Sequence, residues 1–325
     1  MSSITQTQTN INLGLRERKV ASEAMARRMQ SIGFERRSER MANCMERVEY
    51  AVCAECGRVK ITQTYLCRDR FCAVCAAGLA RKRWWSMMLA AEHAGYWKGS
   101  LIAMLTLTVR NCAPTDLKQT LQAMTRAFKR LQQRKFWKEN IMGYARHLEI
   151  TYNAETNTMH PHYHILLVLA PDANKLGVIG STVATDWKDA LRVNYAPIYD
   201  IRYAYTSRNI TIKDKNGETI ADRDNLALIS AFSQASKYMC KPSNILDISD
   251  EGDLSAVIAA VSGARTAAYG GCIKEARAAV NLDGCDELDD STDIELKCCD
   301  KDMLIATAHW ALGEWINDIT EEVAF

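Results

Sequence analysis

The 325-residue sequence lacks any apolar run that approaches the ~20 residues needed to cross a bilayer. Its N-terminus is polar and carries no recognisable secretory signal. These two absences predict a cytoplasmic protein that does not associate with a membrane. They also bear on the 12 cysteines, because disulfides are rare in reducing compartments. We therefore expect the cysteines to act as metal ligands or buried thiols.

The net charge of +2 conceals a strong division along the chain. Residues 1–150 contain 26 Lys and Arg against 12 Asp and Glu, whereas residues 246–325 contain 5 against 18. A basic N-terminal half suggests a polyanionic partner, and nucleic acid is the commonest one. The acidic C-terminal region would be repelled by phosphates. We expect it to face solvent, another protein or the basic half itself.

Three histidines alternate in the stretch His160–Pro–His162–Tyr–His164, and the apolar residues 165–169 follow them. Because side chains in a strand point the same way at every second residue, the three imidazoles are expected on one face of a strand. A strand that begins with imidazoles and continues as core is typical of a metal site fixed to a sheet. The alternative is a surface hairpin with incidental histidines.

A second strand-like run, residues 146–152, precedes this stretch and carries Glu149. The polar residues 153–157 between the two runs are typical of a hairpin turn. A turn centred near Glu155 and Thr156 places Glu149 opposite His162. Two imidazoles and a carboxylate suit Mg²⁺ or Mn²⁺ with a phosphate-bearing substrate, although imidazole also binds Zn²⁺.

The cysteines form a separate pattern in the basic half. Cys53-x₂-Cys56 and Cys72-x₂-Cys75 have the spacing of a four-cysteine zinc site, with Cys67 as an alternative to one of the first two. Four thiolates leave no open coordination position, so we expect a structural zinc site rather than a catalytic one. The surrounding Lys and Arg residues make this module a plausible DNA contact.

The remaining periodicities predict an α+β fold, with an antiparallel sheet and helices packed on one side of it. Helices are expected over 79–97, 116–138, 174–192 and 224–241, strands over 101–109 and 195–204, and a hairpin over 210–221. We predict four regions: a basic, helical and partly flexible segment (1–43), a zinc module with a basic helix (44–98), the sheet-containing domain (99–245) and an acidic, mainly helical region (246–325) that includes Trp310 and Trp315 in a helical pattern.

The predicted helix 224–241 carries a second group of chemical interest. Gln234 lies one turn before Tyr238, and Lys241 lies about one turn after it. A tyrosine with a pKa of about 10 is ionised to about one part in a thousand at neutral pH, so its activation costs roughly 4 kcal/mol. A nearby lysine and a metal-bound phosphate would offset that cost.

Taken in order, Leu105–Val109, His162-Tyr-His164 and Lys237-Tyr238-x-x-Lys241 resemble the three motifs of HUH endonucleases. The segment Cys67-Arg-Asp-Arg-Phe-Cys-Ala-Val-Cys75 is similar to the rolling-circle plasmid replication initiators, the Rep family, that use one catalytic tyrosine. The resemblance covers roughly residues 50–280. It implies an HUH core with an N-terminal zinc-binding module.

The resemblance also implies an activity, a site-specific nickase and strand transferase acting at a plasmid origin. His162 and His164 would hold the metal, with Glu149 expected as third ligand from the hairpin geometry and His160 outside the site. Tyr238 would attack the phosphate, leaving a 5′-phosphotyrosine and a 3′-hydroxyl primer, while Lys241 orients or neutralises the phosphate. Implied partners are double- and single-stranded origin DNA, a host helicase and polymerase, and a second copy in a possible homodimer.

Position 234 departs from the family pattern. Related initiators commonly have a glutamate four residues before the tyrosine, where it acts as a general base during termination, whereas this chain has Gln234. Release would then use another carboxylate, a second tyrosine such as Tyr203 or Tyr205, or a partner subunit. The alternatives to an initiator are an HUH-type transposase and a non-enzymatic zinc-containing DNA-binding regulator.

Overall fold

The computed structural model describes residues 5–53, 59–94, 101–170, 176–203, 212–213, 219–221, 242–280 and 303–317. The chain divides into two compact units: residues 1–78, 241–246 and 288–325 form the first, and residues 79–240 and 247–287 form the second. Helix α3 (Ala73–Ala94) begins in the first unit and continues into the second. Among the described residues, no helix is both long and apolar enough to span a membrane.

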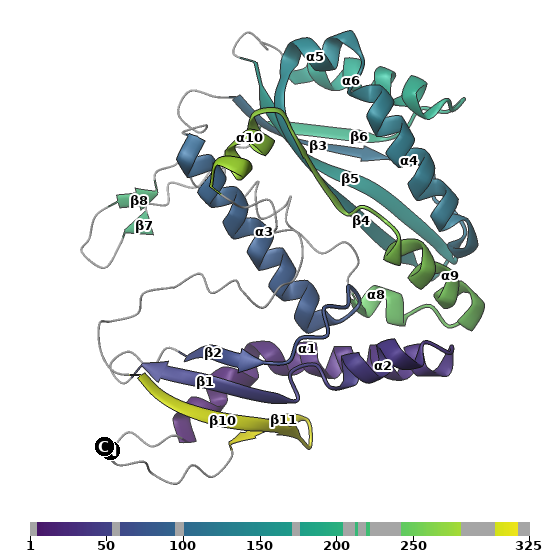
Figure 1. Cartoon of the computed structure of the whole chain (residues 1–325). Coiled ribbons are helices and arrows are strands. Elements are labelled where there is room, and N and C mark those ends of the chain that lie inside the picture. Colours follow the sequence, from purple (N-terminus) through teal and green to yellow (C-terminus); the bar gives the residue numbers. More distant parts are fainter. Residues whose placement is uncertain are drawn as a thin grey trace. The chain divides into compact units, whose positions relative to one another are not determined.

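The first unit contains a four-stranded antiparallel sheet in the order β11-β10-β1-β2. Its strands come from both ends of the chain, because β1 pairs with β10 from Arg47↔His309 to Cys53↔Met303 (Figure 1). The strands are β1 (Arg47–Cys53), β2 (Val59–Thr64), β10 (Met303–Ala311) and β11 (Glu314–Asn317). The helices of this unit are α1 (Thr5–Ser31), α2 (Glu35–Ala42) and α8 (Pro242–Leu246).

The predicted helical pattern around Trp310 and Trp315 is wrong, because these residues lie on a hairpin. Trp310 pairs directly with Trp315 across β10 and β11. The two residues of the turn, Leu312 and Gly313, have φ values of +52° and +81°. Positive φ at both central residues is the backbone of the tight turns that close twisted hairpins. The acidic C-terminal region is therefore not mainly helical at its described end.

The second unit is built on a five-stranded antiparallel sheet in the order β6-β3-β5-β4-β9. The apolar sequences of β3 and β5 place these strands inside the sheet, where both faces are covered. The strands are β3 (Leu101–Thr108), β4 (Ile141–Asn153), β5 (Thr158–Leu169), β6 (Tyr199–Tyr203) and β9 (Ala267–Gly270). A separate small hairpin pairs β7 (Ile212–Lys213) with β8 (Thr219–Ala221), as predicted for 210–221.

Helices cover both faces of this sheet, which corrects the prediction that they pack on one side (Figure 1). On one face, Phe128 of α4 contacts the rings of Tyr144 and Tyr163 edge-on. On the other face, Met87 of α3 and Ile273 of α10 share a core with the sheet. The helices are α4 (Leu117–Leu131), α5 (Lys135–Asn140), α6 (Leu176–Leu191), α9 (Glu251–Ser262) and α10 (Gly271–Ala279), and the 3-10 turn η1 (Pro114–Asp116) precedes α4.

The long helix predicted over 116–138 is two helices. Helix α4 buries one apolar stripe and ends at Leu131, and α5 begins at Lys135. The change of direction brings Trp137 edge-on against Phe128, with ring centroids 5.6 Å apart. The predicted helix 224–241 lies outside the described residues.

Candidate functional site

The hairpin β4–β5 has the predicted turn and the predicted register. Glu149 lies opposite His162, and His147 lies opposite His164. The side chain of Asn153 closes the turn by accepting hydrogen bonds from the main-chain N–H groups of Glu155, at 2.9 Å, and Thr156, at 3.2 Å. This register places the carboxylate and both imidazoles on the same face of the sheet.

The donor atoms of Glu149, His162 and His164 converge on one point. The Nε2 atoms of the two histidines are 3.2 Å apart, and Glu149 Oε2 lies 2.8 Å from His164 Nε2 and 3.5 Å from His162 Nε2. Adjacent ligands of an octahedral cation, each about 2.1 Å from the metal, are about 3 Å apart. The triad therefore has the dimensions of three neighbouring ligands around a small divalent cation, and it leaves other positions open.

The electrostatics of the triad favour a cation. Burial alone would raise the pKa of Glu149, but hydrogen bonds from His162 and His164, together with their charge, hold that pKa well below the ordinary carboxyl value. A carboxylate that stays ionised is a ready ligand for Mg²⁺ or Mn²⁺. His162 is almost fully buried, whereas Glu149 and His164 are half-buried. Part of the side chains of Glu149 and His164 is therefore accessible from outside the protein.

The remaining ring nitrogen of each histidine is held by a neighbouring group. The Nδ1 atom of His164 lies 3.2 Å from Thr106 Oγ1, and Nδ1 of His162 lies 3.2 Å from the main-chain carbonyl oxygen of His160. A cation bound at Nε2 would replace the contact with Glu149 and require the ring hydrogen on Nδ1, where these oxygen atoms can accept it. Such partners orient metal-binding imidazoles and fix their tautomer. Thr106, which the sequence did not single out, is therefore part of the candidate site.

We expect Thr106→Val to lower the affinity for Mn²⁺ by about 10- to 100-fold, the usual cost of losing an outer hydrogen bond at a metal site. The substitution keeps the branched shape and removes only the hydroxyl group. Thr185→Val, on the exposed side of α6, removes a hydroxyl that bonds only its own helix. Calorimetric titration of Mn²⁺ into each variant measures the effect, and equal affinities for the two would contradict it.

His160 lies beside the triad without joining it, as the sequence predicted. Its ring centroid is 5.2 Å from that of His162. Its Nδ1 atom is 2.7 Å from Asn111 Oδ1, and the amide nitrogen of Asn111 donates to Thr158 Oγ1 at 3.2 Å. These contacts direct the ring of His160 along the rim of the site rather than into its centre.

A second group of possible metal ligands lies in the first unit. The sulfur atoms of Cys44, Cys67, Cys72 and Cys75 converge, and all four residues are buried. The Sγ atom of Cys44 is 3.6 Å from Sγ of Cys72 and 3.6 Å from Sγ of Cys75, and Sγ of Cys67 is 3.7 Å from Sγ of Cys75. Four thiolates 2.3 Å from a tetrahedral zinc ion are about 3.8 Å apart. The cluster therefore has the size of a zinc–tetracysteine site.

The predicted ligand set is corrected at one position. Cys72 and Cys75 belong to the group, as does the alternative Cys67, but Cys53 does not. Cys53 is the last residue of β1 and pairs with Met303, so the sheet directs it elsewhere. Cys56 lies outside the described residues. The fourth ligand is Cys44, which has no CxxC partner, so the spacing gave no signal to prefer it.

Hydrogen bonds among the four thiols shift the pKa values of Cys72 and Cys75 in opposite directions. Hydrogen bonds with Cys44, Cys67 and Cys75 hold the pKa of the Cys72 thiol well below its usual value. Hydrogen bonds to Cys44, Cys67 and Cys72 raise the pKa of Cys75. The lowered pKa of Cys72 favours its thiolate, which is the metal-binding form of cysteine.

Tyr238, Lys241 and Gln234 lie outside the described residues, as does Tyr205. Tyr203 is the last residue of β6, at the edge of the sheet, and pairs with Ala103. The roles assigned to Tyr238, Lys241 and Gln234 therefore stay predictions.

A Glu/His/His group on an antiparallel hairpin and a separate four-cysteine group define an α+β protein with two candidate metal centres. The family model of the replication proteins matches residues 58–316 of the chain. The chain therefore belongs to this family, and the predicted resemblance to plasmid Rep initiators is confirmed.

Individual relatives agree with the family assignment. The chain is 32% identical to a protein rep of Bacillus amyloliquefaciens over 80% of its own length and 78% of the relative's. It is 29% identical to a protein rep of Lentilactobacillus hilgardii over 83% of each chain. No solved structure matches the chain significantly.

Proposed function

We propose that this chain is a rolling-circle plasmid replication initiator that nicks one strand of its origin by metal-dependent transesterification. The observation that carries the proposal is the convergence of Glu149, His162 and His164 on one face of the β4–β5 hairpin in a member of a replication-protein family. Such a triad suits a cation that also binds a phosphate, because it leaves coordination positions open.

Two metals fit the donor sets. The nitrogen and oxygen donors of the triad suit Mg²⁺ or Mn²⁺, and the four sulfur donors of the cysteine group suit Zn²⁺. A cation in the triad would polarise the scissile phosphate and stabilise the charge that develops on it. Zinc in the closed cysteine group would stabilise the fold and take no part in the chemistry.

The chain's own groups then perform the transfer. The phenolic oxygen of Tyr238 attacks the phosphorus, and the bond from phosphorus to the 3′-oxygen breaks. The products are a 5′-phosphotyrosine and a free 3′-hydroxyl, with the phenolic proton formally balancing the new hydroxyl group. Lys241 orients or neutralises the phosphate. The ester conserves the energy of the broken bond, so no nucleotide hydrolysis is required, and the 3′-hydroxyl primes a polymerase.

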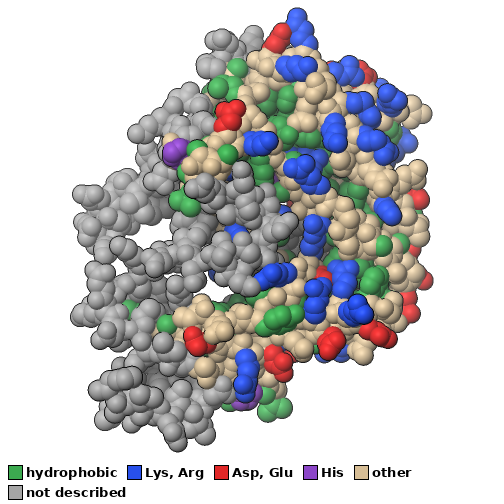
Figure 2. All heavy atoms as spheres, viewed as in Figure 1, with side chains coloured by type: hydrophobic (Ala, Val, Ile, Leu, Met, Phe, Trp, Pro, Cys, Tyr) green, Lys and Arg blue, Asp and Glu red, His purple; other side chains and the backbone are tan. Residues whose placement is uncertain are grey.

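A basic surface on the second unit supports a nucleic-acid partner. Helices α4 and α5 and the segment between them carry seven basic residues, which fall into two groups. Arg130 donates to the carbonyl of Ala190, and Arg134 pairs with Asp186 and Asp189. The other five are exposed: Lys118, Arg126, Lys129, Lys135 and Lys138. Figure 2 shows Lys and Arg side chains spread over this face of the protein. Exposed cations of this kind bind phosphates and make affinity fall with salt.

The proposal predicts that Tyr238→Phe abolishes covalent attachment to DNA, because phenylalanine has no nucleophilic oxygen. Labelled single-stranded origin DNA is mixed with the protein and Mn²⁺, and the adduct is separated on a denaturing gel and mapped by peptide sequencing. Tyr152→Phe is the matched control, because the hydroxyl of Tyr152 donates to Asn157 near the hairpin turn, and it is expected to form the adduct at the rate of the unaltered protein.

Three outcomes separate the possible functions. An adduct on Tyr238 that requires a divalent cation supports the nickase. An adduct on a different residue would overturn the assignment of Tyr238. Tight origin binding with no adduct under any metal would mean that the chain is a DNA-binding regulator instead.

A further inference from the structure

The fourth ligand of the cysteine group reaches its place differently from the other three. Cys67, Cys72 and Cys75 come from one short segment at the start of α3, whereas Cys44 lies in the turn between α2 and β1. We name residues 42–46 the Cys44 turn. Within this turn, Met45 follows Cys44 and has a φ of +54°. Its main-chain N–H group donates to the carbonyl of Tyr65 at 2.8 Å. The position of Cys44 thus depends on what holds this turn.

Helix α1 holds the turn from one side. The fully buried side chain of Lys19 donates from Nζ to the carbonyl oxygens of Ala42, at 2.6 Å, and Cys44, at 2.8 Å. Glu23 lies 3.9 Å from the same Nζ, at the limit of an ion pair. A buried positive charge is costly unless a negative charge lies nearby, so the ammonium group of Lys19 needs such a partner. A zinc ion with four thiolates has a net charge of −2 and would provide that negative charge.

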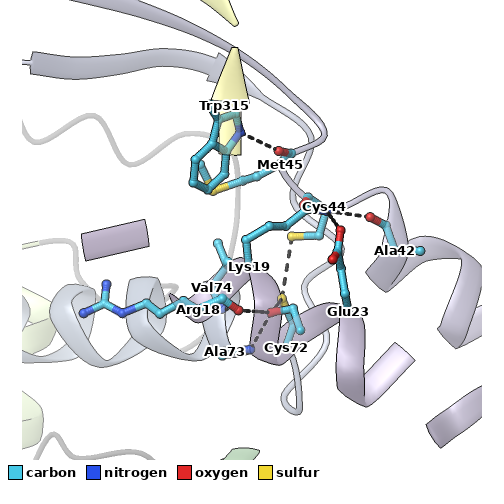
Figure 3. A network of polar contacts seen from close by, with 11 residues as sticks. Arg18, Lys19, Glu23, Ala42, Cys44, Met45, Cys72, Ala73, Val74 and Trp315 are labelled. Atoms are coloured by element: carbon cyan, nitrogen blue, oxygen red, sulfur yellow. Dashed lines mark hydrogen bonds and ion pairs between the residues drawn. The ribbon is translucent and has the colours of Figure 1, made fainter. Parts of the chain in front are cut away.

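The C-terminal hairpin holds the turn from the other side. The indole Nε1 of Trp315 donates to the carbonyl of Met45 at 3.0 Å, and the main-chain N–H of Trp310 donates to the carbonyl of Glu46 at 2.7 Å. Figure 3 shows Lys19 and Trp315 reaching the turn from different elements. The carbonyls of Ala42, Cys44, Met45 and Glu46 are therefore all bound by α1 or by the hairpin β10–β11.

The same helix also contacts the opposite half of the cysteine group. Ser22 Oγ lies 3.3 Å from Sγ of Cys72 and accepts a hydrogen bond from the N–H of Ala73 at 3.0 Å, at the start of α3. Ser22 and Lys19 are three residues apart, which places them on one side of α1. One helix thus joins the Cys44 turn to the segment that supplies the other three ligands.

We propose that Lys19 and Trp315 are positioning residues of the cysteine metal site, so that metal binding and the docking of α1 and the C-terminal hairpin stabilise each other. The proposal rests on the proposed function, in which this group holds zinc. A ligand that binds only the docked arrangement stabilises that arrangement, and by the same linkage undocking weakens the ligand. The metal site would then connect the two ends of the chain.

The test measures how fast zinc leaves the full-length protein. A chelator that changes colour on binding zinc is added in excess. Zinc released from the Glu149 triad is identified as the phase that His164→Ala removes, because imidazole also binds Zn²⁺. We expect Lys19→Met and Trp315→Phe each to raise the release rate by about 10- to 100-fold, the usual effect of losing an outer-sphere contact. Lys129→Met and Trp137→Phe, both in the second unit, are the matched controls and should leave the rate unchanged.

A second measurement needs no substitution. Removal of zinc from the unaltered protein should increase amide hydrogen exchange in residues 303–317, while exchange in β4 and β5 stays as before. The proposal is overturned if both variants release zinc at the unaltered rate, or if exchange in the hairpin does not respond to zinc. A protein that binds no zinc in the cysteine group would instead refute the zinc assignment in the proposed function.

Discussion

Replacing Glu149 by glutamine is expected to lower the rate of Mn²⁺-dependent cleavage of origin DNA by at least about 100-fold. Glutamine keeps the size of the side chain and removes its negative charge. Glu149 supplies the negative charge of the site, because an imidazole ligand carries none. A metal that polarises a phosphate contributes several kcal/mol to transition-state stabilisation, and about 2.7 kcal/mol already corresponds to 100-fold.

The fold should survive this substitution. Glutamine has nearly the same volume as glutamate, so its introduction at this partly exposed position leaves no cavity. We expect the melting temperature to stay within a few degrees and the dissociation constant for Mn²⁺ to rise by at least about 10-fold. Glu155→Gln, in the exposed turn of the same hairpin, is the matched control, because only its main chain contributes to the turn. Full cleavage activity in Glu149→Gln would remove this residue from the site.

The second large effect is expected from Cys44→Ala, which should abolish stable zinc binding in the first unit. Structural zinc sites contribute about 10–16 kcal/mol, so the loss of one of four thiolates forfeits several kcal/mol and more than about 100-fold in affinity. The remaining cysteines would hold the metal only weakly, and thermal unfolding of the first unit should shift to lower temperature. Zinc content per chain, measured by atomic absorption after dialysis, gives the result directly.

Cys53→Ala is the control that distinguishes the two ligand sets. Cys53 is as buried as Cys44, so both substitutions remove a buried thiol of the same size. Only Cys44 has its sulfur within reach of Cys72 and Cys75. We expect Cys53→Ala to retain one zinc per chain. The opposite pattern, with zinc lost from Cys53→Ala and kept in Cys44→Ala, would restore the ligand set that the CxxC spacing suggested.

The β4–β5 hairpin could be predicted because its strands and turn are adjacent in the sequence. Alternation places His162 and His164 on one face, and the short polar turn fixes which residue of the first strand meets them. The structure confirms the pairing of Glu149 with His162. Thr106 was not predictable in the same way, because it reaches His164 from β3, across a sheet order that no local pattern specifies.

The cysteine group shows the opposite case. The three cysteines of one short segment were found among the candidates, but the choice of the fourth depends on the path of the chain between α2 and β1. Contacts from Lys19 and Trp315 set that path, and these residues are 25 and 270 positions away from the carbonyls they bind. Spacing favoured Cys53 and Cys56 because they form a CxxC pair, whereas the sheet withdraws Cys53 into pairing with Met303.

The assembly of one sheet from both ends of the chain has a consequence for synthesis. Strand β1 lies between β2 and β10 in the finished sheet, but β10 and β11 are the last described elements to leave the ribosome. Until they arrive, β1 presents an open row of main-chain donors and acceptors, the kind of edge that pairs with other chains. A nascent or prematurely terminated chain is therefore exposed to misassociation at β1, even when every residue of the β4–β5 hairpin has been made.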